Sequence, residues 1–304
     1  MNKITICIAT YKRPSMLEKL IISILNCNID KSLIGDISII VVDNDTEKTA
    51  EGVINVLMER IKGIYKLIYS SYPYKGIVNV RNECLKKALS LEPDYIVFVD
   101  DDEYVTPDWL NELVKTIINN NADIVRGPVF SEPEIKVSDS ISYWFTIRAT
   151  YSDNSQIYRI ATGNLIMNRL SFQKFDVWFD PRFNITGSSD YFFGVQLLKK
   201  GARFYWAANA IAYETIPESR ANLKWLIKRF YRGASTFTWV LKLEKKYVSL
   251  IKKVMASFIY ILMGICALVI LPFPIKKRYW GILKLSEGIG GITGLFNFLY
   301  LEYK

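Results

Sequence analysis

Four acidic residues in a row, Asp100, Asp101, Asp102 and Glu103, follow a short apolar run at residues 95–99. The run has the length and β-branched content of a buried strand, so the acids would stand at its carboxyl end. Adjacent carboxylates repel one another unless a cation lies among them, and such oxygen ligands suit Mg²⁺ or Mn²⁺ together with a substrate's phosphates. Because open α/β sheets bind ligands beyond the carboxyl ends of their strands, the acids predict a metal-dependent site for a phosphorylated substrate. The alternative is an acidic loop before a helix, since residues 106–108 have suitable N-terminal capping chemistry.

The chain of 304 residues contains no histidine. Its absence excludes Ser-His and Cys-His nucleophile pairs, His-ligated zinc and imidazole general bases, so acid–base chemistry must fall to carboxylates, Lys, Tyr or Cys. The cysteines are widely spaced without metal-type pairing, which predicts reduced structural thiols in the cytosol: Cys7, Cys27, Cys84 and Cys266. A net charge of +9 and a pI near 9.2 favour anionic partners, namely nucleic acid, phosphorylated substrates or an acidic membrane surface.

The elements that must position the acids alternate along the first half of the chain. Strand-like runs and segments with helical spacing take turns: strands at 4–9, 37–42, 66–69, 95–99 and 123–125, and helices at 14–27, 47–61, 77–90 and 109–118. This alternation predicts an α/β fold with a mostly parallel sheet covered by helices on both faces. The polar residues after the first, second and fourth strands would then meet at one edge of the sheet, beginning at Thr10, Asp43 and Asp100.

The last third of the chain has a different character. A long basic helix is predicted at residues 221–245. Residues 254–275 carry no charge, are bracketed by basic residues and are long enough to span a bilayer, and a weaker apolar segment follows at 279–300. We therefore expect a hydrophobic helical hairpin at 246–304, which would associate with a membrane surface, mediate homo-oligomerisation or pack within a soluble protein.

Four basic residues recur every four positions from just before the predicted basic helix into it, and so line one helical face: Arg220, Lys224, Lys228 and Arg232. Such a face is either simply solvated or attracts anionic lipid or a lipid-diphosphate acceptor. We expect no nucleic-acid partner, because the basic residues gather beside an apolar tail rather than along an aromatic-studded groove.

Several short motifs occur in a characteristic order: ICIATYKRP at 6–14, VVDN at 41–44, the segment 76–88 with Arg81-Asn82, FVDDD at 98–102 and GSSDYFF at 187–193. In order and spacing they resemble the motifs of family 2 glycosyltransferases. The resemblance covers roughly residues 3–240. It implies a GT-A-type, Rossmann-like domain at 1–245, with a nucleotide-binding half at 1–129 and an acceptor-binding half at 130–245.

The resemblance implies that a set of residues surrounds a nucleotide-diphosphate sugar donor: Thr10, Tyr11, Arg13, Asp43, Arg81, Asp100 and Asp101. Asp43 would accept a hydrogen bond from the base, Arg81 would hold the nucleotide or its diphosphate, and Asp100 would lie near the ribose. Asp102 would coordinate the Mn²⁺ or Mg²⁺ ion that bridges the diphosphate. Taken alone, Asp43 fits a turn residue and Arg81 a solvated charge on a helix.

On the acceptor side, the resemblance implies that Asp190 is the general base of an inverting transfer. The alternative is a helix N-cap, since Ser188, Ser189 and Asp190 are all capping residues. Many relatives carry Glu where this chain has Ser189. Many GT-A enzymes also supply a later His to the metal, and here Glu214 stands near that position, either as a replacement ligand or as an exposed strand-end acid.

The sequence therefore predicts a metal-dependent inverting glycosyltransferase at the cytoplasmic face of the cell membrane. Its acceptor would be a membrane-associated glycan or lipid-linked molecule, and the family resemblance implies bacterial surface polysaccharide synthesis, such as lipopolysaccharide, O-antigen or capsule. Two alternatives remain: transfer of the sugar to polyprenyl phosphate, where a phosphate oxygen attacks with little need for a base, and a non-catalytic nucleotide-sugar-binding protein.

Overall fold

The computed structural model describes residues 1–61, 63–146, 150–269 and 275–302. The chain forms two compact units, each assembled from separate stretches. One unit contains Met1–Glu132, Arg148–Asn184 and Ser189–Thr215, and the other contains Pro133–Ile147, Ile185–Ser188 and Ile216–Lys304. The domain boundary predicted at residue 245 falls inside the second of these units.

The first unit is built on an eight-stranded sheet with the strand order β3-β2-β1-β4-β9-β6-β10-β8. Its strands are β1 (Asn2–Thr10), β2 (Ile34–Asp43), β3 (Tyr65–Ser71), β4 (Tyr95–Phe98), β6 (Ile124–Arg126), β8 (Gln156–Ile157), β9 (Leu165–Asn168) and β10 (Phe204–Trp206). The strands β1 to β4 run parallel, as do β6 and β10, whereas β9 is antiparallel to both of its neighbours. The predicted α/β fold with a mostly parallel sheet is confirmed.

Helices cover both faces of this sheet, as predicted. They are α1 (Pro14–Leu25), α2 (Glu51–Arg60), α3 (Ile77–Ser90), α4 (Trp109–Asn119), α6 (Arg169–Phe175) and α7 (Ser189–Lys199). In β1, Ile6 belongs to the apolar core formed with α1, α2 and α4. The next residue, Cys7, points to the other face, where its thiol donates a hydrogen bond to the Cys84 carbonyl of α3 at 3.7 Å.

A second, three-stranded sheet in the order β5-β11-β7 was not expected from the sequence. Its strands are β5 (Glu103–Val105), β7 (Val129–Pro133) and β11 (Ala212–Ile216). The acidic run is therefore not a simple loop before a helix, because its last residue, Glu103, already pairs with Glu214 of β11. A run of three residues between two turns carries too little periodicity to be recognised as a strand.

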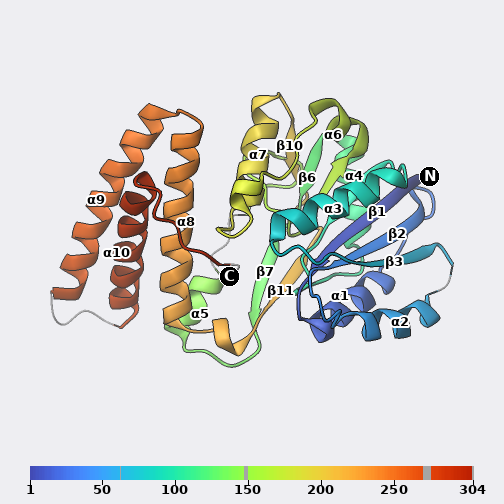
Figure 1. The fold of residues 1–304 in the computed structure, drawn as a ribbon, viewed down its shortest axis with the longest axis horizontal. Coiled ribbons are helices and arrows are strands. Elements are labelled where there is room, and N and C mark those ends of the chain that lie inside the picture. The colour runs from blue at the N-terminus through green and yellow to red at the C-terminus, as the bar shows by residue number, and fades with distance from the viewer. Residues whose placement is uncertain (62, 147–149, 270–274, 303–304) are drawn as a thin grey trace. The chain divides into compact units, whose positions relative to one another are not determined.

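The second unit is helical and contains α5 (Asp139–Thr146), α8 (Leu223–Leu243), α9 (Tyr247–Val269) and α10 (Ile275–Leu295), with α10 lying between α8 and α9 (Figure 1). A short 3-10 helix at Glu218–Arg220 also belongs to this unit, and another at Pro181–Phe183 belongs to the first unit. The three long helices correspond to the segments predicted at 221–245, 254–275 and 279–300, although residues 270–274 lie outside the described residues. By length and composition, α9 is apolar enough to cross a membrane, and 22% of its most apolar stretch is buried.

Candidate active site

The predicted meeting of the strand ends is confirmed at β1, β2 and β4. Thr10, the last residue of β1, is in register with Asp43, the last residue of β2. On its other side β1 pairs with β4, which ends two residues before Asp100. Because these strands are parallel, their carboxyl ends open on one edge of the sheet. There the Thr10 hydroxyl donates a hydrogen bond to Asp101 at 2.9 Å.

Arg13 supplies positive charge to the acidic run. Its Nη1 lies 2.9 Å from Asp101 Oδ1 and 2.8 Å from Asp102 Oδ2. Both carboxylates are buried, with 7% and 10% of their side-chain surface exposed, so solvent screens these ion pairs only weakly. Asp101 also accepts a 3.4 Å hydrogen bond from the backbone N–H of Tyr11, whose side chain is exposed. The structure therefore brings together five of the residues that the sequence selected.

Arg81 joins a second group of predicted residues. It extends from α3, where one guanidinium nitrogen donates to Asp100 Oδ1 at 3.2 Å and another donates to Ser189 Oγ at 3.1 Å. Arg81 is only 8% exposed, which excludes the alternative of a solvated charge on a helix. The planar guanidinium can reach both partners at once, so it fixes the end of β4 relative to the start of α7.

Asp190 follows Ser189 and lies half-buried in the first turn of α7. The helix begins before it, so Asp190 stands inside the helix rather than at its N-cap. The positive end of the helix dipole favours a carboxylate at this position. Asp190 is also near enough to Asp100 for its negative charge to help raise the pKa of that residue.

Asp43 is completely buried, and its carboxylate is hydrogen-bonded to the loop that follows β2 and to β3. Its Oδ1 accepts a hydrogen bond from the backbone N–H of Asp45 at 2.9 Å. Its Oδ2 accepts from the backbone N–H of Ala50 at 3.2 Å and from the Tyr69 hydroxyl at 3.0 Å. These bonds match the turn-residue interpretation, because they hold the chain in place after β2. A contact between Asp43 and a nucleotide base stays a prediction.

Glu214 lies beside the acidic run. It is half-buried, and its Oε2 accepts a hydrogen bond from the Ser131 hydroxyl at 3.1 Å. Its charge contributes to the rise in the pKa of both Asp102 and Glu103. Glu214 is therefore part of the same electrostatic cluster rather than an isolated acid at the surface.

Burial dominates the electrostatics of the cluster. It raises the pKa of Asp102 to about 7, with a further contribution from the charge of Asp101 and an opposing one from Arg13. Burial also raises the pKa of Glu103 well above its usual value, and the charge of Asp100 adds to this rise. The pKa of Asp100 is raised for the same reason, but 41% of its side-chain surface is accessible, so solvent moderates the shift.

The cluster contains more acids than its two arginines, Arg13 and Arg81, can balance: Asp100, Asp101, Asp102, Glu103 and Glu214. An excess of buried carboxylate oxygens suits a hard divalent cation. Across the described ranges, however, no three carboxylate or thiol groups are arranged so that they alone could hold a metal ion. A cation on Asp102 would need the phosphates of a donor and water to complete its shell, which is the usual mode for Mg²⁺.

Asn184 supports the site and was not singled out from the sequence. Its Oδ1 accepts hydrogen bonds from the backbone N–H groups of Val78 at 3.1 Å and Asn79 at 3.4 Å, so it caps α3 from a distant loop. A side chain on Gly76 would place its Cβ 2.0 Å from the Asn184 amide, and Gly76 has a φ of 122°. The glycine before the helix was the local signal, but nothing local identifies its partner more than 100 residues away.

Two further residues shape the same region. The Asn82 side chain donates a hydrogen bond to the Phe179 carbonyl at 2.9 Å and accepts one from the Phe179 N–H at 3.0 Å. It therefore anchors the segment that leads towards α7. Gly163 lies against the acids, where an added Cβ would stand 2.3 Å from Glu103 Oε1 and 3.3 Å from Asp100 Oδ2. Only a glycine lets the backbone approach these two carboxylates so closely.

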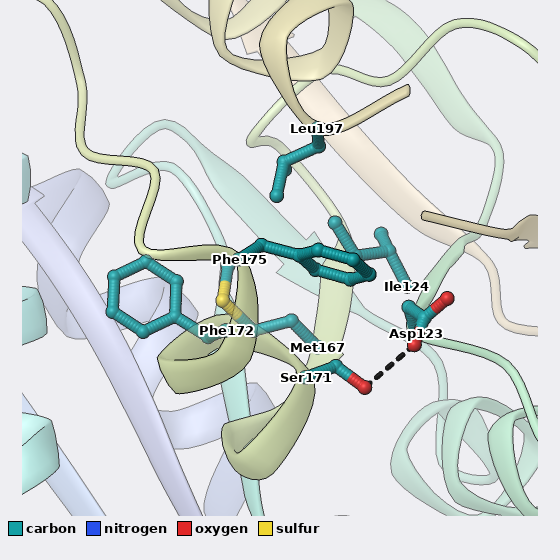
Figure 2. Close-up of a pocket in the computed structure, with 7 residues that line it drawn as sticks. All are labelled: Asp123, Ile124, Met167, Ser171, Phe172, Phe175 and Leu197. Carbon is teal, nitrogen blue, oxygen red and sulfur yellow. Dashed lines mark hydrogen bonds between the residues drawn. The ribbon is translucent and has the colours of Figure 1, made fainter. Parts of the chain in front are cut away.

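A pocket elsewhere in the first unit is too small to hold a sugar. It is lined by Asp123, Ile124, Met167, Ser171, Phe172, Phe175 and Leu197 (Figure 2). Its volume of about 10 Å³ admits at most one water molecule. The Ser171 hydroxyl donates to Asp123 at 2.6 Å, which satisfies a polar group at its rim.

The fold is shared with solved GT-A glycosyltransferases. The mannosyltransferase PcManGT from Pyrobaculum calidifontis, solved with GDP-Man and Mn²⁺, aligns with a TM-score of 0.66 at 13% identity, over 98% of this chain and 88% of that one. TarS 1–349 of S. aureus, solved with UDP-GlcNAc, aligns with a TM-score of 0.53 at 16% identity, over 98% of this chain and 74% of that one. The chain therefore has the GT-A fold of these glycosyltransferases.

Sequence comparison defines the family. The model of glycosyl transferase family 2 matches residues 5–176, and that of glycosyl transferase family group 2 matches residues 95–285. The chain belongs to glycosyl transferase family 2. Among curated proteins, it is similar to the succinoglycan biosynthesis protein ExoM of Rhizobium meliloti (strain 1021), with 29% identity over 245 residues, which is 77% of this chain and 73% of that protein.

Proposed function

We propose that this glycosyltransferase inverts the anomeric centre as it moves a sugar from a nucleotide-diphosphate donor to a membrane-associated glycan or lipid-linked acceptor. We place the reaction in bacterial surface polysaccharide synthesis, at the cytoplasmic face of the membrane. The observation that carries the proposal is the arginine-held acidic run beside Asp190 at the carboxyl edge of the sheet. The similarity to a succinoglycan biosynthesis protein supports the polysaccharide assignment.

On the donor side, Arg13 and Arg81 would bind the diphosphate, because each guanidinium already stands among the strand-end residues. Asp102 would hold Mn²⁺ or Mg²⁺ together with the donor phosphates, and Glu214 is the nearby acid that could assist. When bound, the ion would neutralise charge on the leaving nucleoside diphosphate. The GDP-Man, UDP-GlcNAc and Mn²⁺ found in structures of the same fold support this choice of donor class and ion.

On the acceptor side, Asp190 would accept the proton of the acceptor hydroxyl as its oxygen attacks the anomeric carbon. The new carbon–oxygen bond forms while the bond to the diphosphate breaks, and the bonding electron pair leaves with the nucleoside diphosphate. Attack on the face opposite the leaving group inverts the configuration. Ser189, Arg81 and Asp100 hold the start of α7, so they would fix the position of Asp190 relative to the donor.

The test is a screen of the purified full chain with Mn²⁺ or Mg²⁺ against a panel of nucleotide sugars, followed by Asp190→Asn on the donor that is turned over. We expect transfer to fall by about 10²–10⁴-fold while donor binding is retained. Asp139→Asn is the matched control, because Asp139 also lies in the first turn of a helix, α5. Near-normal transfer by Asp190→Asn would refute the base assignment and favour a polyprenyl phosphate acceptor, whereas donor binding without turnover would indicate a non-catalytic protein.

A further inference from the structure

The outer face of α9 is apolar from Met255 to Val269, and apolar residues flank the exposed Lys252 in its first turns. Eight residues on this face are between 46% and 71% exposed: Val248, Ile251, Met255, Phe258, Ile259, Leu262, Ile265 and Val269. Together they expose on the order of 800 Å² of apolar surface, more than the largest patch of a typical soluble monomer. No charged residue interrupts the helix after Lys253.

The opposite face of α9 packs closely against α10 through small residues. A Cβ on Gly264 would lie 2.8 Å from the Gly281 carbonyl, and a Cβ on Gly288 would lie 2.6 Å from the Ser257 carbonyl. These contacts show that the two helices run alongside each other with their backbones almost touching. The apolar outer face therefore cannot turn inward without separating the helices.

On its far side α10 packs equally closely against α8. A Cβ on Gly290 would lie 2.3 Å from the Tyr231 carbonyl, and one on Gly294 would lie 2.2 Å from the Ser235 carbonyl. The three helices therefore form one layered body, with α9 on the outside, α10 in the middle and α8 beyond it (Figure 1).

The charged residues of these three helices determine how the helices can lie relative to a lipid bilayer. Between α9 and α10, Glu287 Oε2 lies 2.8 Å from Lys284 Nζ, and its Oε1 lies 3.8 Å from Lys253 Nζ. Exposed lysines, Lys224 and Lys228, lie on α8. If α9 crossed a bilayer end to end, the packed helices would enter the hydrocarbon with it and bring these charges along, which is strongly unfavourable.

We infer that α9 lies flat in the surface of an anionic lipid bilayer, with its outer face among the acyl chains and α10 and α8 above it on the aqueous side. Exposed Lys245, Lys246 and Lys252 at its beginning would contact the lipid phosphates. A second copy of α9 is a poorer occupant, because the helix has no acid to pair with these lysines. The inference gives a geometry to the membrane association in the proposed function.

A depth measurement with spin labels separates a flat helix from a spanning one. Two singly labelled proteins are made in a Cys27→Ser background. The first carries the label on the native, exposed Cys266, and the second carries it on Ile251→Cys with Cys266→Ser added. The other two cysteines, Cys7 and Cys84, are buried. The two positions are about 22 Å apart along the helix axis. With the full chain on phosphatidylcholine vesicles containing about a quarter phosphatidylglycerol, we expect both labels at one shallow depth of about 5–10 Å. A depth difference approaching the axial distance would overturn the inference.

Vesicle binding itself is tested by flotation of the full chain with the same vesicles. Leu262→Glu should weaken binding by at least about ten-fold, because a side chain that the acyl chains would bury becomes a charge. Leu170→Glu is the matched control, since Leu170 on α6 is 64% exposed and Leu262 is 62% exposed. The inference would be overturned if the Leu262→Glu protein bound vesicles as well as the parent does. It would also be overturned if the parent were a dimer in detergent-free solution and this substitution dissociated it. Donor turnover measured without vesicles reports on the proposed function separately.

Discussion

Replacing Asp102 by asparagine should make the protein more stable while it loses donor binding. Asp102 is 8% exposed, and burial raises its pKa from an ordinary 3.8 to about 7. At neutral pH and without a cation, the folded protein therefore holds an unfavourable charge, in spite of the Arg13 ion pair at 2.8 Å. Asparagine has nearly the same shape and no charge, and Arg13 retains Asp101 at 2.9 Å.

The size of the effect follows from the two pKa values of Asp102. Between 3.8 and about 7 the folded protein keeps a proton that the unfolded chain has released. The stability of the parent protein therefore falls as the pH rises through this window, and the full loss is reached above the folded pKa. Each pH unit changes the free energy of unfolding by about 1.4 kcal/mol, so the advantage of asparagine should grow by about 2–3 kcal/mol between about pH 5 and pH 8.

The assay is urea denaturation of parent and Asp102→Asn protein at both pH values, with and without Mn²⁺ and the nucleoside diphosphate of the donor. The ligands should stabilise the parent by about 2.7 kcal/mol when present at about a hundred times their Kd. The variant should gain nothing. This separates the charge effect, which is seen without ligand, from the binding effect.

An Asp102→Asn protein that is destabilised equally at both pH values would refute this reasoning, because it would mean that Asp102 contributes through its hydrogen bonds rather than through its charge. Asp180→Asn is a suitable control. The pKa of Asp180 is lowered by its hydrogen bond with Arg182. Asparagine there should therefore destabilise the protein at pH values above the usual aspartate pKa, and this destabilisation should disappear as the pH falls.

Three other substitutions test how the site is held. Arg81→Lys cannot bond two partners with one planar group, so the donor KM should rise by about ten-fold; an unchanged KM would remove Arg81 from the donor site. Asn184→Ala removes the hydrogen-bond acceptor for the first N–H groups of α3 and should lower the free energy of unfolding, measured in urea, by about 1 kcal/mol. An unchanged free energy of unfolding would contradict the capping role. Gly163→Ala forces a Cβ towards a carboxylate and should cost about 1–3 kcal/mol in the same assay, whereas full stability would mean that the backbone yields easily.

The fold could be predicted from local patterns. The helix expected at residues 77–90 is α3 with the same bounds, and the long helices of the last third were found with shifted ends. These elements have strong periodicity and clear flanking residues. The meeting of the strand ends at Thr10, Asp43 and Asp100 could also be predicted, because it follows from parallel strands alone.

The side-chain partnerships could not be predicted, because they depend on residues far apart in the sequence. Nothing near Arg13 indicates that it pairs with acids about 90 positions later. The same holds for Arg81 and Ser189, which are 108 positions apart. Asp43 shows the opposite case, since its burial and its bonds within the loop reflect the turn chemistry that its local sequence already indicated.

The interleaving of the two compact units has a consequence for the order in which the protein can be completed during synthesis. The chain passes from one unit to the other after residues 132, 147, 184, 188 and 215, so no single cut releases either unit as one continuous polypeptide. The four residues Ile185–Ser188, just before the helix that carries Asp190, belong to the second unit. There the Ile185 carbonyl accepts a 2.8 Å hydrogen bond from the backbone of Glu302. The segment leading to the candidate base thus finds this partner only when residue 302 has left the ribosome.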